Sequence, residues 1–310
     1  MTADATEFRL LMLGAMYENG GNVTHRSLDG HPQLAVYPFE SQLGTRHVQD
    51  GLSSMFPLKY RWPEFLLDAT PAQDFHAIID EEAKVRARTP HVSKFRHVRF
   101  DLDDEERKAV YAELVAASGR SRGDNVAAFF RATFATWKNW NASGAEEVYV
   151  GYSPIVTVDT VRILDDLPGA HVLHVVRNPW SAYADTKKRP VPMGIDAYLQ
   201  AWTTCQQHAL LAQRRDPERV HIVKAEDVMA DAVAALGPVC RALGLEVRDS
   251  LATPSWNGEA LDEVYPWGTI RSATPEANLA TAHELSPAEV EHVRAGAWPY
   301  LDELGYSDLL

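Results

Sequence analysis

Short apolar segments that alternate with helical patterns are the feature that most constrains the fold of this chain. Five segments have the length and apolar content of buried strands: 8–13, 33–37, 147–152, 171–176 and 219–224. Helical patterns fill most of the sequence between them. Strands that alternate with helices form a parallel sheet that helices cover on both faces. We therefore predict an α/β protein, a three-layer α/β/α fold with a central parallel sheet.

The helical patterns have the apolar spacing of amphipathic helices. They cover residues 23–29, 70–86, 103–117, 124–141, 157–166, 179–188, 195–214 and 226–244. A last helix is predicted after Ser286, an N-cap residue followed by Pro287 at the first helical position and by Glu289, which completes a capping box. The sequence shows no repeat and no low-complexity linker, so we predict a single domain over 1–310 with a mostly helical insertion at about 55–141.

Composition excludes several classes of protein. Of the 310 residues, 30 are Lys or Arg and 43 are Asp or Glu, giving a net charge of −13, which disfavours nucleic acid and anionic membranes as partners. Two cysteines, Cys205 and Cys240, are too few for a disulfide scaffold or a structural zinc site. No apolar run reaches the roughly 18 residues of a membrane span, and residues 1–7 are too acidic and polar for a signal peptide. We expect a soluble, cytoplasmic protein without a bound metal.

The first strand leads into a loop that can bind an anion. Parallel sheets bind ligands at the carboxyl ends of their strands, and here the chain continues as Glu18-Asn19-Gly20-Gly21-Asn22. Adjacent glycines let backbone N–H groups converge, and a helix N-terminus favours negative charge beside them. Gly-Gly-Asn is also common in tight turns, so both interpretations stay open. The loop is not a Walker sequence, because G-x-x-x-x-G-K-[ST] is absent.

A second candidate site follows the strand at 171–176. Arg177-Asn178-Pro179 leads directly into a helix, and a permanently charged guanidinium at the end of a strand suits a phosphate group. A structural ion pair is the alternative for Arg177, and we favour the ligand. Lys187, Lys188 and Arg189 follow at the end of that helix, where cations also complement the helix dipole.

Taken in order, these segments resemble the sulfotransferase superfamily, which uses 3′-phosphoadenosine 5′-phosphosulfate (PAPS). The similarity is closest to the bacterial and the tyrosylprotein sulfotransferases. The matching pieces are the loop after the first strand, Leu28-Asp-Gly-His-Pro32, Tyr37-Pro-Phe-Glu40, Val175-Val-Arg-Asn-Pro179, Lys224-Ala-Glu-Asp-Val228 and the closing Leu304-Gly-Tyr306. The resemblance spans about the whole chain and implies a P-loop-like sulfotransferase fold with PAPS as the sulfuryl donor. It also implies a place in bacterial secondary metabolism.

The resemblance also implies a role for individual residues. The residues that fall on the loop around the 5′-phosphosulfate are Asn19, Gly20, Gly21, Asn22 and Val23. Arg177 falls on the arginine that binds the 3′-phosphate, and Arg189 on a second basic contact. Arg271 falls near the segment that closes over the nucleotide, and Glu40 near the carboxylate that acts as general base.

Three departures from the family pattern bear on these roles. Glu18 stands where the family has a loop cation, Asp185 replaces the serine eight residues after the arginine, and Gly151 or Tyr152 replaces a lysine. In one interpretation other groups take over: His25, Arg26, Arg46 or His47 as the cation, Thr24 as the hydroxyl and Asn22 as an amide donor. In the other, the pocket serves a different ligand or has lost catalysis. We favour the first.

The mechanism that this interpretation predicts needs a base, because the acceptor must lose a proton before it attacks. Glu40 is the predicted base for a hydroxyl or amine of a small-molecule acceptor, with His47 in reserve. Phe56, Tyr60 and Trp62 are candidates for the acceptor pocket. A diverged protein that uses another activated donor, or binds a nucleotide or metabolite without transfer, is the alternative. A homodimer is left open.

Overall fold

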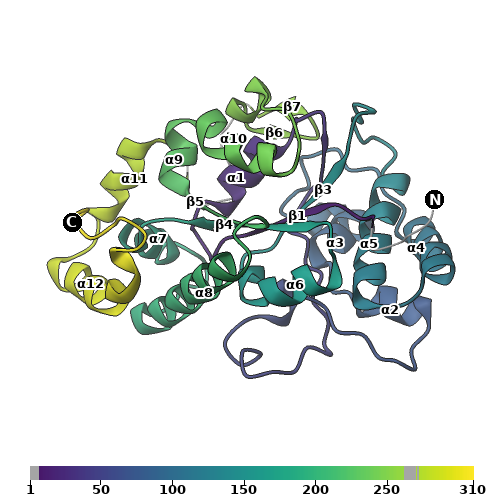
Figure 1. Ribbon diagram of the computed structural model, residues 1–310, viewed down its shortest axis with the longest axis horizontal. Helices are drawn as coiled ribbons and strands as arrows, with labels where there is room; N and C mark the ends of the chain where they lie inside the picture. The colour runs from purple at the N-terminus through teal and green to yellow at the C-terminus, as the bar shows by residue number, and fades with distance from the viewer. Residues whose placement is uncertain (1–6, 262–269, 271) are drawn as a thin grey trace. The chain divides into compact units, whose positions relative to one another are not determined.

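The computed structural model describes residues 7–261, 270 and 272–310 (Figure 1). The chain divides into two compact units. Unit 1 comprises Met1–Met12 and His31–His171, and unit 2 comprises Leu13–Gly30 and Val172–Leu310.

The central sheet has five strands in the order β2-β3-β1-β4-β5. They are β1 (Leu10–Gly14), β2 (Leu34–Val36), β3 (Val148–Tyr152), β4 (Ala170–Val176) and β5 (Val220–Lys224). Within unit 1, β2 and β3 pair in parallel, with Leu34 opposite Val148. Within unit 2, β4 and β5 also pair in parallel, with Val172 opposite Val220. All five predicted strands are present, so the predicted α/β fold with a central parallel sheet is confirmed.

Helices make up most of the rest of both units. Unit 1 contains α2 (Pro71–Ala77), α3 (Glu81–Arg88), α4 (Asp104–Ser118), α5 (Arg122–Thr136) and α6 (Thr160–Asp166), with the 3-10 turns η1 (Leu58–Tyr60), η2 (Pro90–Val92) and η3 (Val156–Asp159). Unit 2 contains α1 (Gly21–Leu28), α7 (Pro179–Thr186), α8 (Ile195–Arg215), α9 (Ala225–Ala230), α10 (Ala232–Ala242), α11 (Pro275–Ala282) and α12 (Pro287–Leu301), with η4 (Asp249–Ala252) and a hairpin of β6 (Ser255–Trp256) and β7 (Glu259–Ala260). In unit 2, β5 packs against α8 and also against α9 and α10, which lie across the strand from α8 (Figure 1). Among the helices that the structure describes, none combines the length and the apolar content that crossing a bilayer requires.

Three helix predictions need correction. The helix predicted over 70–86 is two helices: α2 ends where Ile78 adopts an extended conformation, and Asp80, the N-cap residue of α3, is left-handed (φ 36°). The helix predicted over 226–244 is broken at Asp231, whose side chain caps α10 by accepting a hydrogen bond from the Ala234 N–H. The helix α11 was not predicted, although Thr274 and Pro275 supply its N-cap and first turn. The capping box of Ser286 and Glu289 at the start of α12 is confirmed.

The aromatic residues predicted to line an acceptor pocket lie in the core of unit 1. Phe56 is 3% exposed, Tyr60 is 9% exposed and Trp62 is fully buried. The indole N–H of Trp62 donates a hydrogen bond to Asp166 at 2.7 Å. A ring without any exposed surface cannot form the wall of an open pocket, so the prediction is wrong for Trp62.

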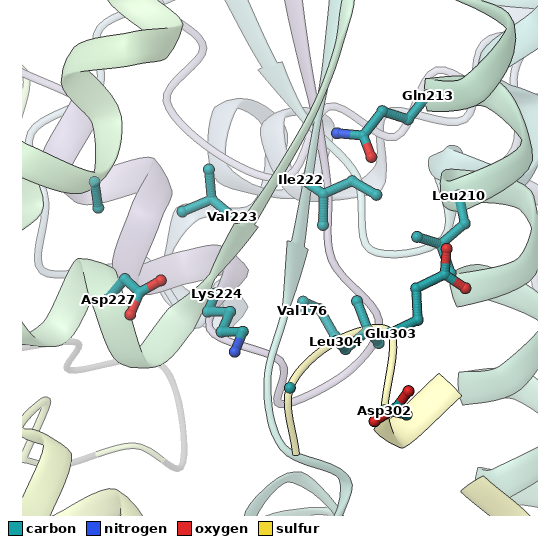
Figure 2. A pocket seen from close by; sticks show the side chains of 12 residues that line it. Val176, Leu210, Gln213, Ile222, Val223, Lys224, Asp227, Asp302, Glu303 and Leu304 are labelled. Carbon is teal, nitrogen blue, oxygen red and sulfur yellow. The ribbon is translucent and has the colours of Figure 1, made fainter. Parts of the chain in front are cut away.

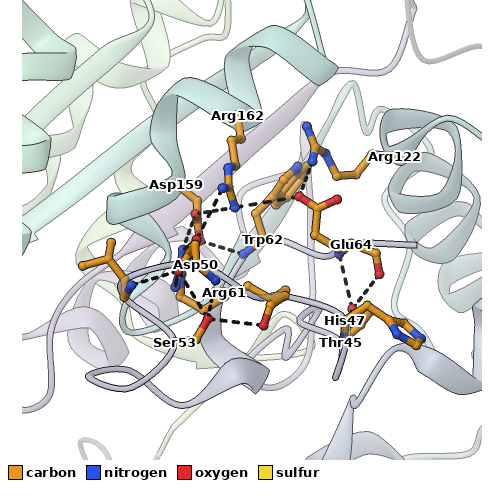
Figure 3. A network of polar contacts seen from close by, with 12 residues as sticks. Thr45, His47, Asp50, Ser53, Arg61, Trp62, Glu64, Arg122, Asp159 and Arg162 are labelled. Atoms are coloured by element: carbon orange, nitrogen blue, oxygen red, sulfur yellow. Dashed lines mark hydrogen bonds and ion pairs between the residues drawn. The ribbon is translucent and has the colours of Figure 1, made fainter. Parts of the chain in front are cut away.

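A buried arginine holds this part of unit 1 together (Figure 3). The Arg61 guanidinium donates to both carboxylate oxygens of Asp159, at 2.7 and 2.8 Å, and to those of Asp50, at 3.1 and 2.7 Å. The Trp62 backbone N–H donates to the same Asp159 carboxylate at 2.9 Å. The hydrogen bonds from Arg61 hold the pKa of Asp50 well below its usual range. The segment around residues 50–62 is thus fixed to η3 by charge-assisted hydrogen bonds.

Replacing Arg61 tests how much this network contributes to stability. We expect Arg61→Met to lower the free energy of unfolding by about 3–5 kcal/mol, because it leaves two carboxylates of the network without their main cation. The measurement is urea unfolding at pH 7. The matched control is Lys59→Met, since Lys59 forms an exposed pair with Glu81 and should cost at most about 1 kcal/mol. Equal losses in the two variants would contradict a dominant role for the buried network.

Candidate functional site

The loop after β1 is built around two residues in left-handed conformations. Glu18 has φ 57° and Gly20 has φ 81°. Two features of Gly20 exclude a side chain. Its positive φ is strained for residues with a Cβ atom, and a Cβ atom there would lie 2.5 Å from the Ala225 Cβ. Asn19 is buried and ties the loop together, donating from its amide to the Tyr17 carbonyl at 2.8 Å and accepting from the Arg177 N–H at 3.2 Å. The loop is therefore a fixed part of unit 2.

The loop delivers the chain into α1 with an open N-terminus. Gly20 is the N-cap residue, no side chain in the described part of the chain caps the helix, and its first turn contains no acidic residue. The backbone N–H groups of the first turn have no partners within the helix. The amide nitrogen of Asn22 in the same turn is also buried without a hydrogen-bond partner among the described residues. These donors and the helix dipole favour an anion at this point.

Arg177 follows β4 and is 1% exposed. Its Nη1 donates to the Glu18 carbonyl at 2.9 Å and to the Asp185 carboxylate at 2.7 Å. Its Nε donates to the Asn278 side chain at 2.5 Å. Nη2 takes part in none of these bonds, and the side chain lines a cavity of about 220 Å³ together with Lys188. The guanidinium is thus part of an ion pair and also faces a cavity, so the structure accommodates both interpretations of Arg177.

The sequence did not predict the residues that position Arg177. Glu226, at the start of α9, accepts hydrogen bonds from the Asn178 N–H at 2.9 Å and from the Asn278 amide at 3.1 Å. The Tyr306 hydroxyl donates to its other oxygen at 2.9 Å, and burial together with the Glu226 charge raises the pKa of this phenol. Asn278 thereby links Glu226 to Arg177. The N-cap residue of α11 could have predicted the helix that contains Asn278. Nothing in the sequence shows that this helix reaches Arg177.

The two carboxylates that depart from the family pattern each bind one of the predicted arginines. The Arg189 Nε lies 3.8 Å from a Glu18 carboxylate oxygen, and the Arg189 guanidinium stacks 4.3 Å from the centre of the Tyr17 ring. Asp185 binds Arg177 and also Lys188, whose Nζ lies 3.0 Å away. Glu18 and Asp185 therefore neutralise cations of the candidate site.

A second cavity of unit 2 lies beside the end of β5 and holds about 490 Å³ (Figure 2). Its acidic lining residues are Asp227, Asp302 and Glu303, and Lys224 is its lysine. The Lys224 ammonium is already engaged, because it lies 4.8 Å from the centre of the Tyr306 ring. An acidic lining with one engaged cation disfavours a polyanionic ligand, so the cavity beside Arg177 is the better candidate.

The other predicted residues of α1 serve the helix itself. The Thr24 hydroxyl donates to the Gly20 carbonyl at 3.1 Å, and Val23 is 2% exposed and belongs to the core. Arg26 lies in the last turn, 5.3 Å from the centre of the Trp256 ring and 3.9 Å from Asp29. The structure thus places the Arg26 guanidinium at the opposite end of α1 from the loop. The role of Arg26 as a replacement for the loop cation stays a prediction.

Glu40 belongs to unit 1, just after β2. Its neighbour Ser41 is bound to the end of β3, because the Ser41 N–H donates to the Tyr152 carbonyl at 2.6 Å. The Glu40 side chain is partly buried, and its Oε2 has no hydrogen-bond partner among the described residues. A carboxylate oxygen held away from water without a donor is a strong hydrogen-bond acceptor, which suits a base.

His47, the reserve base, is partly buried in unit 1 and lines a cavity of about 560 Å³. Asp74 lines the same cavity and is bound by Arg120 at 2.8 Å. Burial raises the pKa of Asp74 above its usual value, and the neighbouring Arg120 and His47 offset only part of this rise. The cavity is large enough for a small organic molecule.

Within unit 2, the structure thus brings together several of the predicted cofactor-binding residues. They are Asn19, Gly20, Gly21, Asn22, Arg177, Asp185 and Arg189. Glu40 and His47 lie in unit 1. Arg271 lies outside the described residues.

Comparisons with known proteins agree with this fold. A model of the family described as "Sulfotransferase family" matches residues 19–249. The sulfotransferase domain of the Synechococcus PCC 7002 olefin synthase is 18% identical with a TM-score of 0.55, over 95% of this chain and 96% of that one. Sulfotransferase STF9 from Mycobacterium avium is 13% identical with a TM-score of 0.45, over 96% of this chain and 77% of that one. No curated protein matches the sequence. The first of these structures shows that the chain has the fold of that domain.

Substitution of Gly20 tests the geometry of the loop. We expect Gly20→Ala to lower the free energy of unfolding by about 1–3 kcal/mol, because alanine is strained at this φ and its methyl group meets Ala225. The measurement is thermal and urea unfolding. Gly51→Ala is the control, since a Cβ atom at Gly51 meets nothing within 4 Å. An unchanged stability of the Gly20 variant would show that the loop adapts freely.

Proposed function

This chain belongs to the sulfotransferase family, and from that premise we propose that it transfers a sulfuryl group from PAPS to a hydroxyl or amine of a small-molecule acceptor. The observation that carries the proposal is the uncapped N-terminus of α1, reached through the loop whose Glu18 carbonyl accepts a hydrogen bond from Arg177. An open helix N-terminus and a guanidinium are two independent groups that bind phosphate or sulfate.

The residues present fit such a donor, and Asp185 competes with it for two cations. The backbone N–H groups of the first turn of α1 and the orphaned amide of Asn22 would hold the phosphosulfate. Arg177 and Lys188, which line the cavity of about 220 Å³, would hold the 3′-phosphate. Asp185 lies between these two cations and must share them with the ligand. PAPS supplies an activated sulfuryl group whose leaving oxygen needs stabilisation as the bond to sulfur breaks.

The chain's own residues divide the work of the proposed reaction. Glu40 would remove the proton from the acceptor, and its buried oxygen without a donor supports that role. Asn22 and the first-turn N–H groups would stabilise the leaving oxygen in place of the family's loop cation. Arg189 would contact the nucleotide after its pair with Glu18 opens. The cavity beside His47 has room for a small acceptor.

We propose the cytoplasm as the site of this reaction. Cys205 and Cys240 are both buried and both free thiols. Thiols persist in reducing compartments.

A second candidate function is favoured by the two carboxylate–arginine pairs. Because Glu18 neutralises Arg189 and Asp185 neutralises Arg177, the site is nearly balanced in charge without a ligand. Such a site suits a donor or metabolite with fewer negative charges than PAPS. The alternative is therefore a diverged sulfotransferase-fold protein that uses another activated donor or binds a nucleotide without transfer.

Calorimetric titration with adenosine 3′,5′-bisphosphate, the product of PAPS, tests whether the site binds the proposed donor. We expect wild-type protein to bind the bisphosphate, and Arg177→Gln in combination with Asp185→Asn to weaken binding about 10- to 100-fold, since a charged hydrogen bond contributes about 1.5–3 kcal/mol. Replacing both partners leaves no buried charge unpaired. Arg214→Gln is the control, because this exposed arginine pairs with Glu303 and should not affect binding. No binding by the wild-type protein would favour the second candidate.

Removal of the loop carboxylate should have the opposite effect. We expect Glu18→Gln to tighten bisphosphate binding about three- to tenfold at low salt, because it removes a negative charge beside the anion site and frees Arg189. The gain should shrink in 0.5 M NaCl, where the Debye length falls to only a few ångströms. Glu246→Gln is the control, since Glu246 pairs with Arg248 on the surface. Weaker binding in the Glu18 variant would mean that Glu18 itself holds the ligand.

A further inference from the structure

Unit 1 contains two glutamates with buried carboxylate oxygens that lack donors. They are Glu40 and Glu82, and in each the Oε2 atom has no hydrogen-bond partner among the described residues. Glu82 lies in the first turn of α3, and its side chain is 11% exposed. Each orphaned acceptor costs free energy if its carboxylate is charged, and a proton placed between two such oxygens satisfies both.

The backbone holds these two glutamates side by side. The Asp80 N–H donates to the Gln42 carbonyl at 2.9 Å, and the Ile79 N–H donates to the Gly44 carbonyl at 3.0 Å. The Gln42 side chain caps α3 by accepting from the Glu81 N–H at 2.9 Å. In addition, the Glu40 backbone N–H lies near the Glu82 carboxylate and lowers its pKa. The two carboxyl groups are therefore fixed on neighbouring segments within one unit.

Among the residues that the structure describes, Lys94 is the cation found beside the pair. Lys94, which follows η2, binds Glu82 directly and also interacts with Glu40 and with Glu81. Helix α4 also packs against α3, but its charged residues have other partners: Asp104 pairs with Arg88, and Arg107 pairs with Asp80. Of the charged groups around Glu82, Glu40 opposes its ionisation and Lys94 favours it.

The balance of these effects raises the pKa of Glu82. A position in the first turn of a helix should favour the charged carboxylate, and so do Lys94 and the Glu40 N–H. Burial and the Glu40 charge outweigh them and raise the pKa of Glu82 to about 7. A proton on one of two coupled carboxyl groups belongs to the pair and not to either residue alone.

We propose that Glu82 is a positioning residue for the base Glu40: the two carboxyl groups share one proton, and Lys94 is their counter-ion. This inference rests on the proposed function, in which Glu40 takes the proton of the acceptor. The pair acts in the form that has lost its shared proton: the acceptor's O–H or N–H bond breaks, its electron pair stays on the acceptor atom, and the proton forms an O–H bond with Glu40. Glu82 then shares that proton until it passes to water. The pair is thereby a base of neutral strength, which a lone exposed glutamate is not.

The pair can be tested without any assumption about activity. The experiment is a carbon-13 NMR titration of the glutamate carboxyl groups in the full chain, assigned with Glu40→Gln and Glu82→Gln. We expect one group of the wild-type pair to titrate near pH 7. In Glu40→Gln the midpoint of Glu82 should fall by about one pH unit, because the variant removes the neighbouring carboxylate charge. The same Glu82 midpoint with and without Glu40 would overturn the proposal.

Two further variants keep the proposal testable if Glu40→Gln or Glu82→Gln does not fold. Lys94→Met should raise the midpoint of the pair by about one pH unit, because it removes the counter-ion. Glu81→Gln is the matched control on the same turn of α3, since Glu81 pairs with Lys59, and it should leave the midpoint near pH 7. A Lys94 variant whose midpoint does not rise would contradict the role of Lys94 as counter-ion.

An activity profile separates this inference from the proposed function. Transfer from PAPS to p-nitrophenol, used as a probe acceptor, should rise with pH with a midpoint near 7 in the wild-type protein. In Glu82→Gln the midpoint should fall by one unit or more while KM changes little. If the titrations are coupled but Glu40→Gln keeps its full rate, the pair stands and the base proposed above is wrong. If the titrations are independent, the pair is wrong whatever the rates.

Discussion

A buried guanidinium is the constraint on which the candidate donor site depends. Arg177 is 1% exposed, and a charge in that position must be paired and hydrogen-bonded to be tolerated. Its partners come from three separate segments: the Glu18 carbonyl in the loop, Asp185 at the end of α7 and Asn278 in α11. Because one side chain needs all three, the loop conformation and the placement of α11 are tied to the end of β4.

The same requirement explains the charges around the site. Without a ligand, a guanidinium and an ammonium near each other need a counter-ion, and Asp185 supplies it for Arg177 and Lys188. A ligand with a phosphate group competes with that carboxylate for the same donors. Binding of the ligand then weakens an existing ion pair. The affinity therefore depends on how much more strongly the cations interact with the ligand than with Asp185, and not on the number of cations. The open N-terminus of α1 has no such competitor among the side chains of its first turn.

The sequence predicted the elements whose signals are local. All five strands and the capping box at Ser286 are confirmed, because apolar runs and caps are formed by neighbouring residues. The break at residues 78–80 was missed, since neither an extended isoleucine nor a left-handed aspartate is as clear a marker as glycine or proline.

In the candidate site, local sequence patterns predicted the elements but not the contacts between distant residues. The loop and the strand end at Arg177 could be predicted because they follow strands of a parallel sheet. The hydrogen bond that Arg177 donates to Asn278 and the interaction between Glu40 and Glu82 join residues far apart in the sequence. Only the packing of α11 and α3 determines them. The resemblance implied that Asp185, eight residues after Arg177, lies at the site, but it did not imply that Asp185 binds Lys188 too.

The two departures from the family pattern have to be considered together. A pocket that decays after loss of function has no reason to keep a buried arginine, since its uncompensated charge destabilises the fold. Here the arginine is kept, and each of the two new carboxylates lies against one of the two predicted arginines. Glu18 and Asp185 therefore change the charge of the site without removing its donors. That combination favours an anion site with a reduced affinity for highly charged ligands over a site that has been abandoned.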